Sequence, residues 1–161
     1  MVSWEHDYLF VKITTNSEII VLLVILKMSS NRPVIFFDGV CNLCNRSVQF
    51  ILKRDKKKQF LFAPLQGKTG TEFLNSRQLP LNDFNSFILV EGDKIYTKST
   101  AALTVARKLG GGWKLLYGFM IVPKFIRNAV YNFIATHRYK WFGRKDECMI
   151  PTPELKERFL D

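Results

Sequence analysis

The chain has little of what metal sites and disulfide-rich scaffolds are built from. Its 161 residues include only three cysteines, Cys41, Cys44 and Cys148, and two histidines, His6 and His137. A sparse and odd-numbered set of cysteines excludes the even-numbered disulfide framework of small secreted domains. We therefore expect a protein of a reducing compartment, and we place it in the cytoplasm.

A long hydrophobic run is also missing. The longest one, residues 19–26, has eight residues, whereas a membrane-spanning helix needs about 20. A signal peptide would fit that length, but it starts with basic residues. The residues before this run are acidic instead, namely Glu5, Asp7 and Glu18. The sequence thus predicts neither a transmembrane span nor an export signal.

The regular alternation of strand and helix signals begins only at Pro33. We expect residues 1–31 to be an N-terminal extension, either a short apolar segment or sequence upstream of a true start at Met28. Residues 32–161 should form one domain, because a chain that is 47% hydrophobic and of this length can bury a single core.

Acidic residues are too few to balance the basic ones, and the formal net charge is +10. Such a charge favours acidic proteins, nucleic acid or an anionic membrane surface, without choosing among them. Basic and aromatic residues alternate between Arg138 and Arg144, but no recognised nucleic-acid motif accompanies them. An acidic protein is therefore an expected partner, and nucleic acid is not.

Strand and helix signals follow one another from residue 34 onward. The predicted elements are a strand at 34–37, a helix at 42–55, a strand at 60–63, a weaker helix at 71–78, strands at 86–91 and 94–97, and a helix from Ser99 or Thr100 to the glycine triplet at 110–112. The first two strands should be parallel, with a right-handed crossover. The last two should form a hairpin around Gly92 and Asp93. This β-α-β-α-β-β-α order predicts an α/β protein with a thioredoxin-like sheet.

Beyond that order, Pro123 is placed to start one more helix. Its apolar residues Ile126, Val130, Phe133 and Ile134 recur at helical spacing. We expect them to pack against the sheet domain as an added C-terminal helical cap.

Cys41 and Cys44 lie at the predicted start of the helix at 42–55. There the sulfur of Cys41 meets unpaired backbone N–H groups and the positive end of the helix dipole, which stabilise a thiolate. Cys44 follows on the same face, within reach of a disulfide. We expect Cys41 to be presented to solvent as the attacking thiolate and Cys44 to lie inward as the resolving thiol, with no cofactor or metal.

Other interpretations of the pair stay open. A zinc site would need further ligands from Cys148, His137 or His6, and no second Cys-x-x-Cys exists to supply them. The cysteines can also be ordinary packing residues. In either case the chain would be a non-enzymatic binding module whose basic cap docks an acidic partner.

Asp38 precedes the pair by three residues. If it is partly buried, it can assist proton transfer to or from the resolving cysteine. The alternative is that its side chain only forms an Asx-type turn into Gly39. Cys148 is either a third thiol that takes part in exchange or an incidental one.

Residues 38–44, Asp-Gly-Val-Cys-Asn-Leu-Cys, resemble the Asp-Gly-x-Cys-x-x-Cys signature of the DCC family of predicted thiol-disulfide oxidoreductases. The resemblance covers roughly residues 33–161 and extends to Ser99-Thr100-Ala101, residues 131–135, Arg138-Tyr139, residues 142–144, Cys148 and residues 151–153. It implies a thioredoxin-like fold with Cys41 and Cys44 as the redox pair. The expected protein is a cofactor-free thiol-disulfide oxidoreductase that acts on a protein or small-molecule disulfide or thiol.

Overall fold

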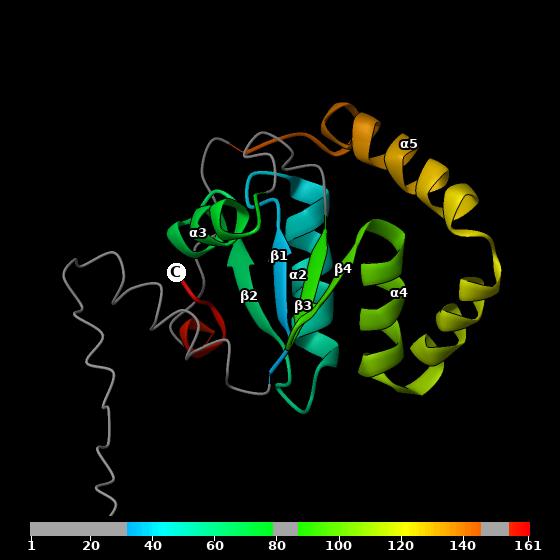
Figure 1. Ribbon diagram of the computed structural model, residues 1–161, viewed down its shortest axis with the longest axis horizontal. Helices are drawn as coiled ribbons and strands as arrows, with labels where there is room; N and C mark the ends of the chain where they lie inside the picture. Colours follow the sequence, from blue (N-terminus) through cyan, green and yellow to red (C-terminus); the bar gives the residue numbers. More distant parts are fainter. Residues whose placement is uncertain (1–31, 79–86, 146–154) are drawn as a thin grey trace, which may run out of the picture.

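The computed structural model describes residues 32–78, 87–145 and 155–161. The expectations about the N-terminal extension with Met28, and about Cys148, concern residues outside these ranges. Within them the chain forms a four-stranded sheet with helices on both faces and a helical arm along one side (Figure 1).

The sheet has the strand order β2-β1-β3-β4. Its strands are β1 (Val34–Phe37), β2 (Leu61–Pro64), β3 (Ile88–Glu91) and β4 (Lys94–Thr97). β1 and β2 are parallel, as the sequence predicts, and β3 is antiparallel to both β1 and β4. The expected α/β, thioredoxin-like arrangement is confirmed.

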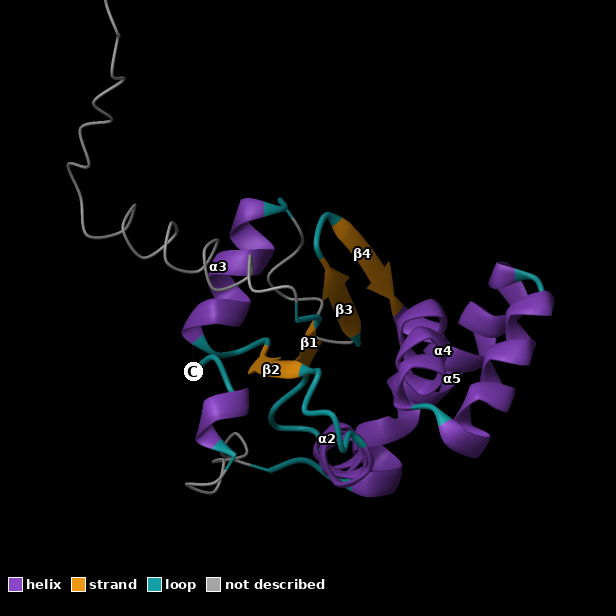
Figure 2. Cartoon of the chain, turned by 90° about the horizontal axis from the view of Figure 1, so that it is seen from below, coloured by secondary structure: helices purple, strands orange, loops and turns teal. Residues whose placement is uncertain are grey.

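The central strand β1 is apolar along its whole length because helices cover both faces of the sheet. These helices are α2 (Asn42–Arg54), α3 (Lys68–Ser76) and α4 (Lys98–Leu109). Ile35 and Phe37 pack in one cluster with residues of α2 and α4. Val34 and Phe36 point the other way, where Phe36 stacks on Phe73 of α3 at 4.3 Å between ring centroids. Figure 2 shows the sheet between these two helical layers.

Several element ends differ from the predicted ones by one to three residues. β2 includes Pro64, which was expected to stop it, because β2 is an edge strand where a missing N–H is tolerated. α3 begins at Lys68 instead of Thr71, and no side-chain cap marks its start. α4 begins at Lys98, with Thr97 at the N-cap just upstream of the two predicted caps.

After α4 the chain forms an arm of two helices, η1 (Gly111–Ile121) and α5 (Lys124–Phe142). Gly110 ends α4 with a φ of +75°, in line with the predicted glycine stop. The 3₁₀ helix η1 was not predicted, whereas α5 follows Pro123 directly. No helix in the described part of the chain has both the length and the hydrophobicity to cross a bilayer.

The apolar residues of α5 do not pack as predicted. Ile126, Val130, Phe133 and Ile134 are 44%, 57%, 58% and 40% exposed. The buried residues of α5 are instead Ala135 and Arg138, and Arg138 is buried in an ion pair. The added C-terminal helix is confirmed, but its predicted buried face is wrong because hydrogen bonds and charge hold its inner side.

The last residues return to the β2 edge of the sheet through η2 (Lys156–Arg158). Phe159 forms a parallel bridge with Phe62. Arg158 makes a buried ion pair with Asp55, at the end of α2, with an N–O distance of 2.5 Å. The C-terminus therefore closes the core on the side opposite the arm (Figure 1).

Candidate active site

The cysteine pair lies where the chain leaves β1 and enters α2. Cys41 occupies the N-cap of α2 with an extended backbone, φ −84° and ψ 122°. Its Sγ accepts a hydrogen bond from the backbone N–H of Cys44 at 3.5 Å. Such an N–H is otherwise unpaired at a helix start and stabilises a negative sulfur. The predicted place of Cys41 at the helix start is confirmed.

The two thiols differ in acidity. The pKa of Cys41 is lowered from 9.0 to about 6, and the largest cause is a side-chain hydrogen bond from Cys44. The backbone N–H of Cys44 and the charge of Arg138 also lower this pKa, whereas burial raises it. The same side-chain hydrogen bond, together with burial and the charge of Cys41, raises the pKa of Cys44. At neutral pH Cys41 is therefore the thiolate, and Cys44 is the thiol that donates to it.

The accessibility of the two sulfurs is the reverse of the prediction. Cys41 is 0% exposed. Cys44 is half-buried and borders a cavity. The expectation that the helix start presents Cys41 to solvent is therefore wrong, because a distant part of the chain covers this end of α2.

The covering segment is residues 143–145, directly after α5. Arg144 pairs with Cys41 in an isolated antiparallel bridge. The Nδ2 of Asn42 donates a hydrogen bond to the carbonyl oxygen of Phe142 at 2.9 Å, which ties the start of α2 to the end of α5. The start of α2, and Cys41 with it, is therefore held against this segment.

Replacing Asn42 with alanine should make Cys41 more reactive, because it removes one of the ties that hold the covering segment. The rate of iodoacetamide alkylation at Cys41 should rise severalfold. The pKa should stay near 6, since Asn42 is not among the groups that set it. Peptide mapping of the reduced protein across pH measures both quantities. Asn75→Ala, at an exposed asparagine of α3, is the control, and equal rates in both variants would show that the tie does not limit access.

Asp38 is buried, with 1% of its surface exposed. Its Oδ1 accepts hydrogen bonds from the Val40 N–H at 3.2 Å and from Nε2 of Gln66 at 2.7 Å. Its Oδ2 accepts from Arg138 at 2.5 Å and from the hydroxyl of Tyr139. The bond to Val40 is the Asx-type turn that the sequence offered as one alternative. The other alternative was a role in proton transfer, which required Asp38 to be at least partly buried, and Asp38 is buried.

Arg138 and Tyr139 belong to the site, although the sequence assigned them no role. They lie 100 and 101 residues from Asp38 along the chain. Burial, and then the hydrogen bond to Asp38, raise the pKa of Tyr139, which keeps it a protonated donor at neutral pH. The one signal that pointed to them was their place in the family resemblance. Gln66, just after β2, gave no signal.

Among the described residues, one group of His, Cys, Asp and Glu side chains is compact enough to hold a metal ion. It consists of Asp38, Cys41 and Cys44. Their ligand atoms lie within 4.8 Å of one another. His137, one of the three residues that the zinc interpretation offered as further ligands, is not part of the group. Each oxygen of Asp38 already accepts two hydrogen bonds, and the guanidinium of Arg138 brings a positive charge to the site. These surroundings favour a thiolate at the cysteine pair over a bound metal cation.

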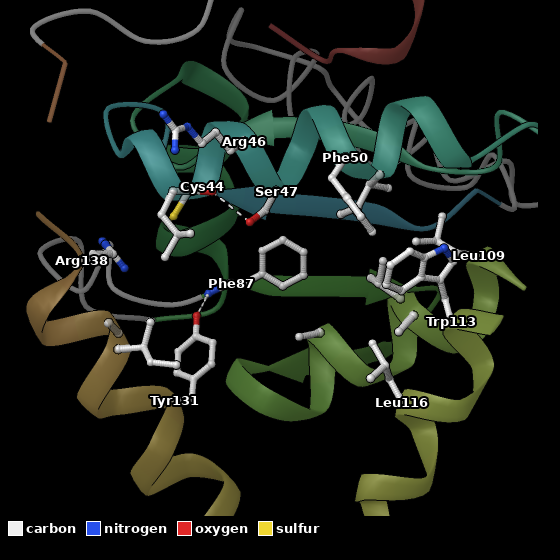
Figure 3. A pocket seen from close by; sticks show the side chains of 17 residues that line it. Cys44, Arg46, Ser47, Phe50, Phe87, Leu109, Trp113, Leu116, Tyr131 and Arg138 are labelled. Atoms are coloured by element: carbon white, nitrogen blue, oxygen red, sulfur yellow. Dashed lines mark hydrogen bonds between the residues drawn. The ribbon is translucent and has the colours of Figure 1, made fainter. Parts of the chain in front are cut away.

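A cavity of about 570 Å³ opens beside Cys44, between α2, α4 and the arm. Cys44 and Arg138 lie at one end of it, and Trp113 and Leu116 lie at the other (Figure 3). Its walls are mostly apolar, with Phe50 and Phe87 between the two ends. The cavity can therefore take an apolar group next to the more accessible sulfur of the pair.

Two relatives share much of the sequence. A Bacillus subtilis protein, described as uncharacterized protein YuxK, is 54% identical over 127 residues, which cover 79% of this chain and 93% of that protein. An Arabidopsis thaliana protein, described as DCC family protein At1g52590, chloroplastic, is 37% identical over 118 residues, which cover 73% of this chain and 69% of that protein. No solved structure matches significantly.

A family model covers the site itself. Residues 35–144 match the family described as DCC1-like thiol-disulfide oxidoreductase. This range contains the two cysteines, Asp38 and both of its partners on α5. The family resemblance seen in the sequence is confirmed, and the chain belongs to the DCC1-like thiol-disulfide oxidoreductase family.

Proposed function

We propose that the chain is a dithiol oxidoreductase in which Cys41 attacks a substrate disulfide and Cys44 resolves the mixed disulfide. The observation that supports this best is the opposite shift in the pKa of two sulfurs at one helix start. A thiolate is both the nucleophile and the better leaving group in thiol-disulfide exchange. The family description points to thiols and disulfides as the substrates.

The reaction balances without a cofactor. The Cys41 thiolate forms a bond to one sulfur of the substrate disulfide, and the other sulfur leaves as a thiolate that takes up a proton. Cys44 then loses its proton and attacks the sulfur of Cys41, which expels the remaining substrate sulfur. The substrate gains two electrons and the protein gains a disulfide, which an external dithiol or two molecules of a monothiol reduce by the same exchange in reverse, leaving as a disulfide.

In this proposal Cys41 reacts first and Cys44 second, because each sulfur shifts the pKa of the other. While Cys41 is a thiolate, its hydrogen bond and its charge help hold the proton on Cys44. Once Cys41 is bonded to substrate it carries no charge, so both effects disappear. The pKa of Cys44 then falls, helped by the positive charge of Arg138. Cys44 thus becomes a nucleophile only after the first step.

Asp38 is our candidate for the group that receives the proton of Cys44. Its carboxylate lies within 4.8 Å of both sulfurs. Arg138 and Tyr139 hold that carboxylate in place from α5. In the same proposal the cavity takes an apolar group of the substrate beside Cys44, while residues 143–145 move to admit the substrate sulfur to Cys41.

The thiolate of Cys41 should titrate with a midpoint near pH 6, measured by the ultraviolet absorbance of the reduced protein. Because this pKa lies below the value of 9.0 for an ordinary thiol, the thiolate contributes stability that is fully present above that value. This contribution is lost as the pH falls through about 6. Urea unfolding of the reduced protein should therefore show stability rising across this window relative to Cys41→Ala. Parallel curves for the two proteins would contradict the shift.

The direct test compares thiol chemistry with zinc binding. Free thiols are counted in the purified protein with and without a chelator, before and after mild oxidation. Reversible loss of two thiols through one intramolecular disulfide, with the chelator making no difference, supports the oxidoreductase. Thiols that react only after chelation would support the binding module with zinc-bound cysteines.

Two further parts of the proposal concern the protein as a whole. Residues 32–161 are proposed to be sufficient for the fold and the activity, since they supply the four strands of the sheet and the helices on both of its faces. A cytoplasmic location is proposed because a reducing compartment keeps the pair in the dithiol form that attacks. The Arabidopsis relative is chloroplastic by its description, so the location is not carried over from it.

A further inference from the structure

The side of helix α5 that faces the protein carries Ala135, Ile134 and several polar side chains, whereas most of the large apolar side chains of α5 face away. On the inner side, Asn128 accepts a hydrogen bond from Ser99 at 2.6 Å, and the hydroxyl of Tyr131 accepts one from the backbone N–H of Phe87 at 2.9 Å. Arg138 is paired with Asp38. An amphipathic helix normally buries its apolar stripe. Because the large apolar side chains of α5 are exposed, we expect them to contact another molecule.

The exposed side chains continue from α5 onto η1 and form what we call the apolar ridge. The ridge consists of side chains that are all more than half exposed, including Leu115, Phe119, Ile121, Phe125, Phe133 and Trp141. Ile121 and Leu115 reach 91% and 81%. These residues lie along the arc that η1 and α5 trace beside α4 (Figure 1). So many large exposed apolar groups on one unit mark an interaction surface.

The charge around the ridge has a single sign. Between Asp93 and Asp146 the sequence has eleven lysines and arginines and no acidic residue. Five of these basic residues are exposed on the arm and on the segment after it, namely Lys114, Lys124, Lys140, Arg144 and Lys145. The surface that covers the ridge must therefore accept large apolar side chains and carry negative charge.

We propose that the ridge docks on the surface of an anionic lipid bilayer, a property beyond the redox function and independent of it. Interfacial helices of this type bury aromatic and aliphatic side chains at the level of the headgroups, while flanking lysines and arginines contact anionic lipids. Tryptophans such as Trp141 favour that interface. A second copy of the chain would bring two basic rims together, which repel each other. Aliphatic residues such as Leu115 and Ile121 do not stack on nucleic-acid bases.

The test is co-sedimentation of the full reduced chain with vesicles of phosphatidylcholine, with and without phosphatidylglycerol. We expect binding to the anionic vesicles, weaker binding to the neutral ones, and loss of binding as salt screens the charges. Phe125→Ala should weaken binding roughly tenfold, because it removes one buried aromatic side chain. Phe125 is 74% exposed, so the variant should unfold at the same urea concentration as the wild type.

A pair of lysines provides the matched control. Lys124 is the first residue of α5 on the arm, and Lys68 is the first residue of α3 on the opposite face of the sheet. Lys124→Ala should weaken vesicle binding, and Lys68→Ala should leave it unchanged. Equal effects of the two lysine variants, or vesicle binding that Phe125→Ala leaves intact, would overturn the proposal. It would also be overturned by a dimer that Phe125→Ala disrupts, or by binding to polyglutamate without binding to vesicles.

Discussion

Cys41→Ser should reduce the rate at which the protein reduces a small disulfide to the uncatalysed background, whereas Cys44→Ser should accumulate mixed disulfides on Cys41. The first variant lacks the only sulfur of the pair that is ionised at neutral pH, and the thiolate is the nucleophile. The second keeps that thiolate but has no thiol to expel the bound substrate. Mass spectrometry of the trapped adducts and a reductase assay measure the two effects.

A comparison of serine with alanine at position 44 separates trapping from acidity. The side-chain hydrogen bond from Cys44 is the largest effect that lowers the pKa of Cys41. Cys44→Ser retains a hydroxyl donor and Cys44→Ala does not, so the pKa of Cys41 should be higher in the alanine variant. Both variants keep the backbone N–H at 3.5 Å. If Cys44→Ser forms no adducts on Cys41 while Cys41→Ser forms them on Cys44, the order of attack is reversed and accessibility outweighs ionisation.

Local sequence was enough to predict the elements that carry the cysteines. The apolar run of β1, the turn after it and the helical spacing of α2 are all read within about twenty residues, and together they place Cys41 at a helix start. The reason is that strand and helix periodicity are local properties. The parallel pairing of β1 with β2 followed from the strand-helix-strand order of β1, α2 and β2.

The residues that cover the site and those that set its charge could not be predicted from local sequence. Arg138 lies in a strongly basic helix, where an arginine is usually solvated, and its partner Asp38 is 100 residues away. The same distant region also lies against the buried Cys41, through the bridge between Cys41 and Arg144. The exposed stripe of α5 misled the prediction because periodicity shows that a helix is amphipathic, but not which side faces the protein.

Breaking the buried ion pair between Asp38 and Arg138 should have the largest effect on stability. Asp38→Asn leaves a buried guanidinium without its carboxylate, and Arg138→Met leaves a buried carboxylate without its cation. Either change should lower the free energy of unfolding by about 3–5 kcal/mol, as expected when one partner of a buried pair is removed. The double variant should lose less than the sum of the two, because neither charge is then left unpaired.

The same two variants should move the pKa of Cys41 in opposite directions. The charge of Arg138 lowers this pKa and that of Asp38 raises it. Arg138→Met should therefore shift the thiolate titration upward from about 6, and Asp38→Asn should shift it downward.

The second buried pair, Arg158 with Asp55, is the matched control for both measurements. It has the same N–O distance of 2.5 Å and is similarly buried, but neither of its residues is among the main groups that shift the pKa of Cys41. Arg158→Met should destabilise the protein to a similar extent and leave the titration unchanged. If Arg138→Met and Arg158→Met lose equal stability and neither moves the titration, the Asp38–Arg138 pair only holds the arm to the sheet domain and has no part in tuning the thiolate.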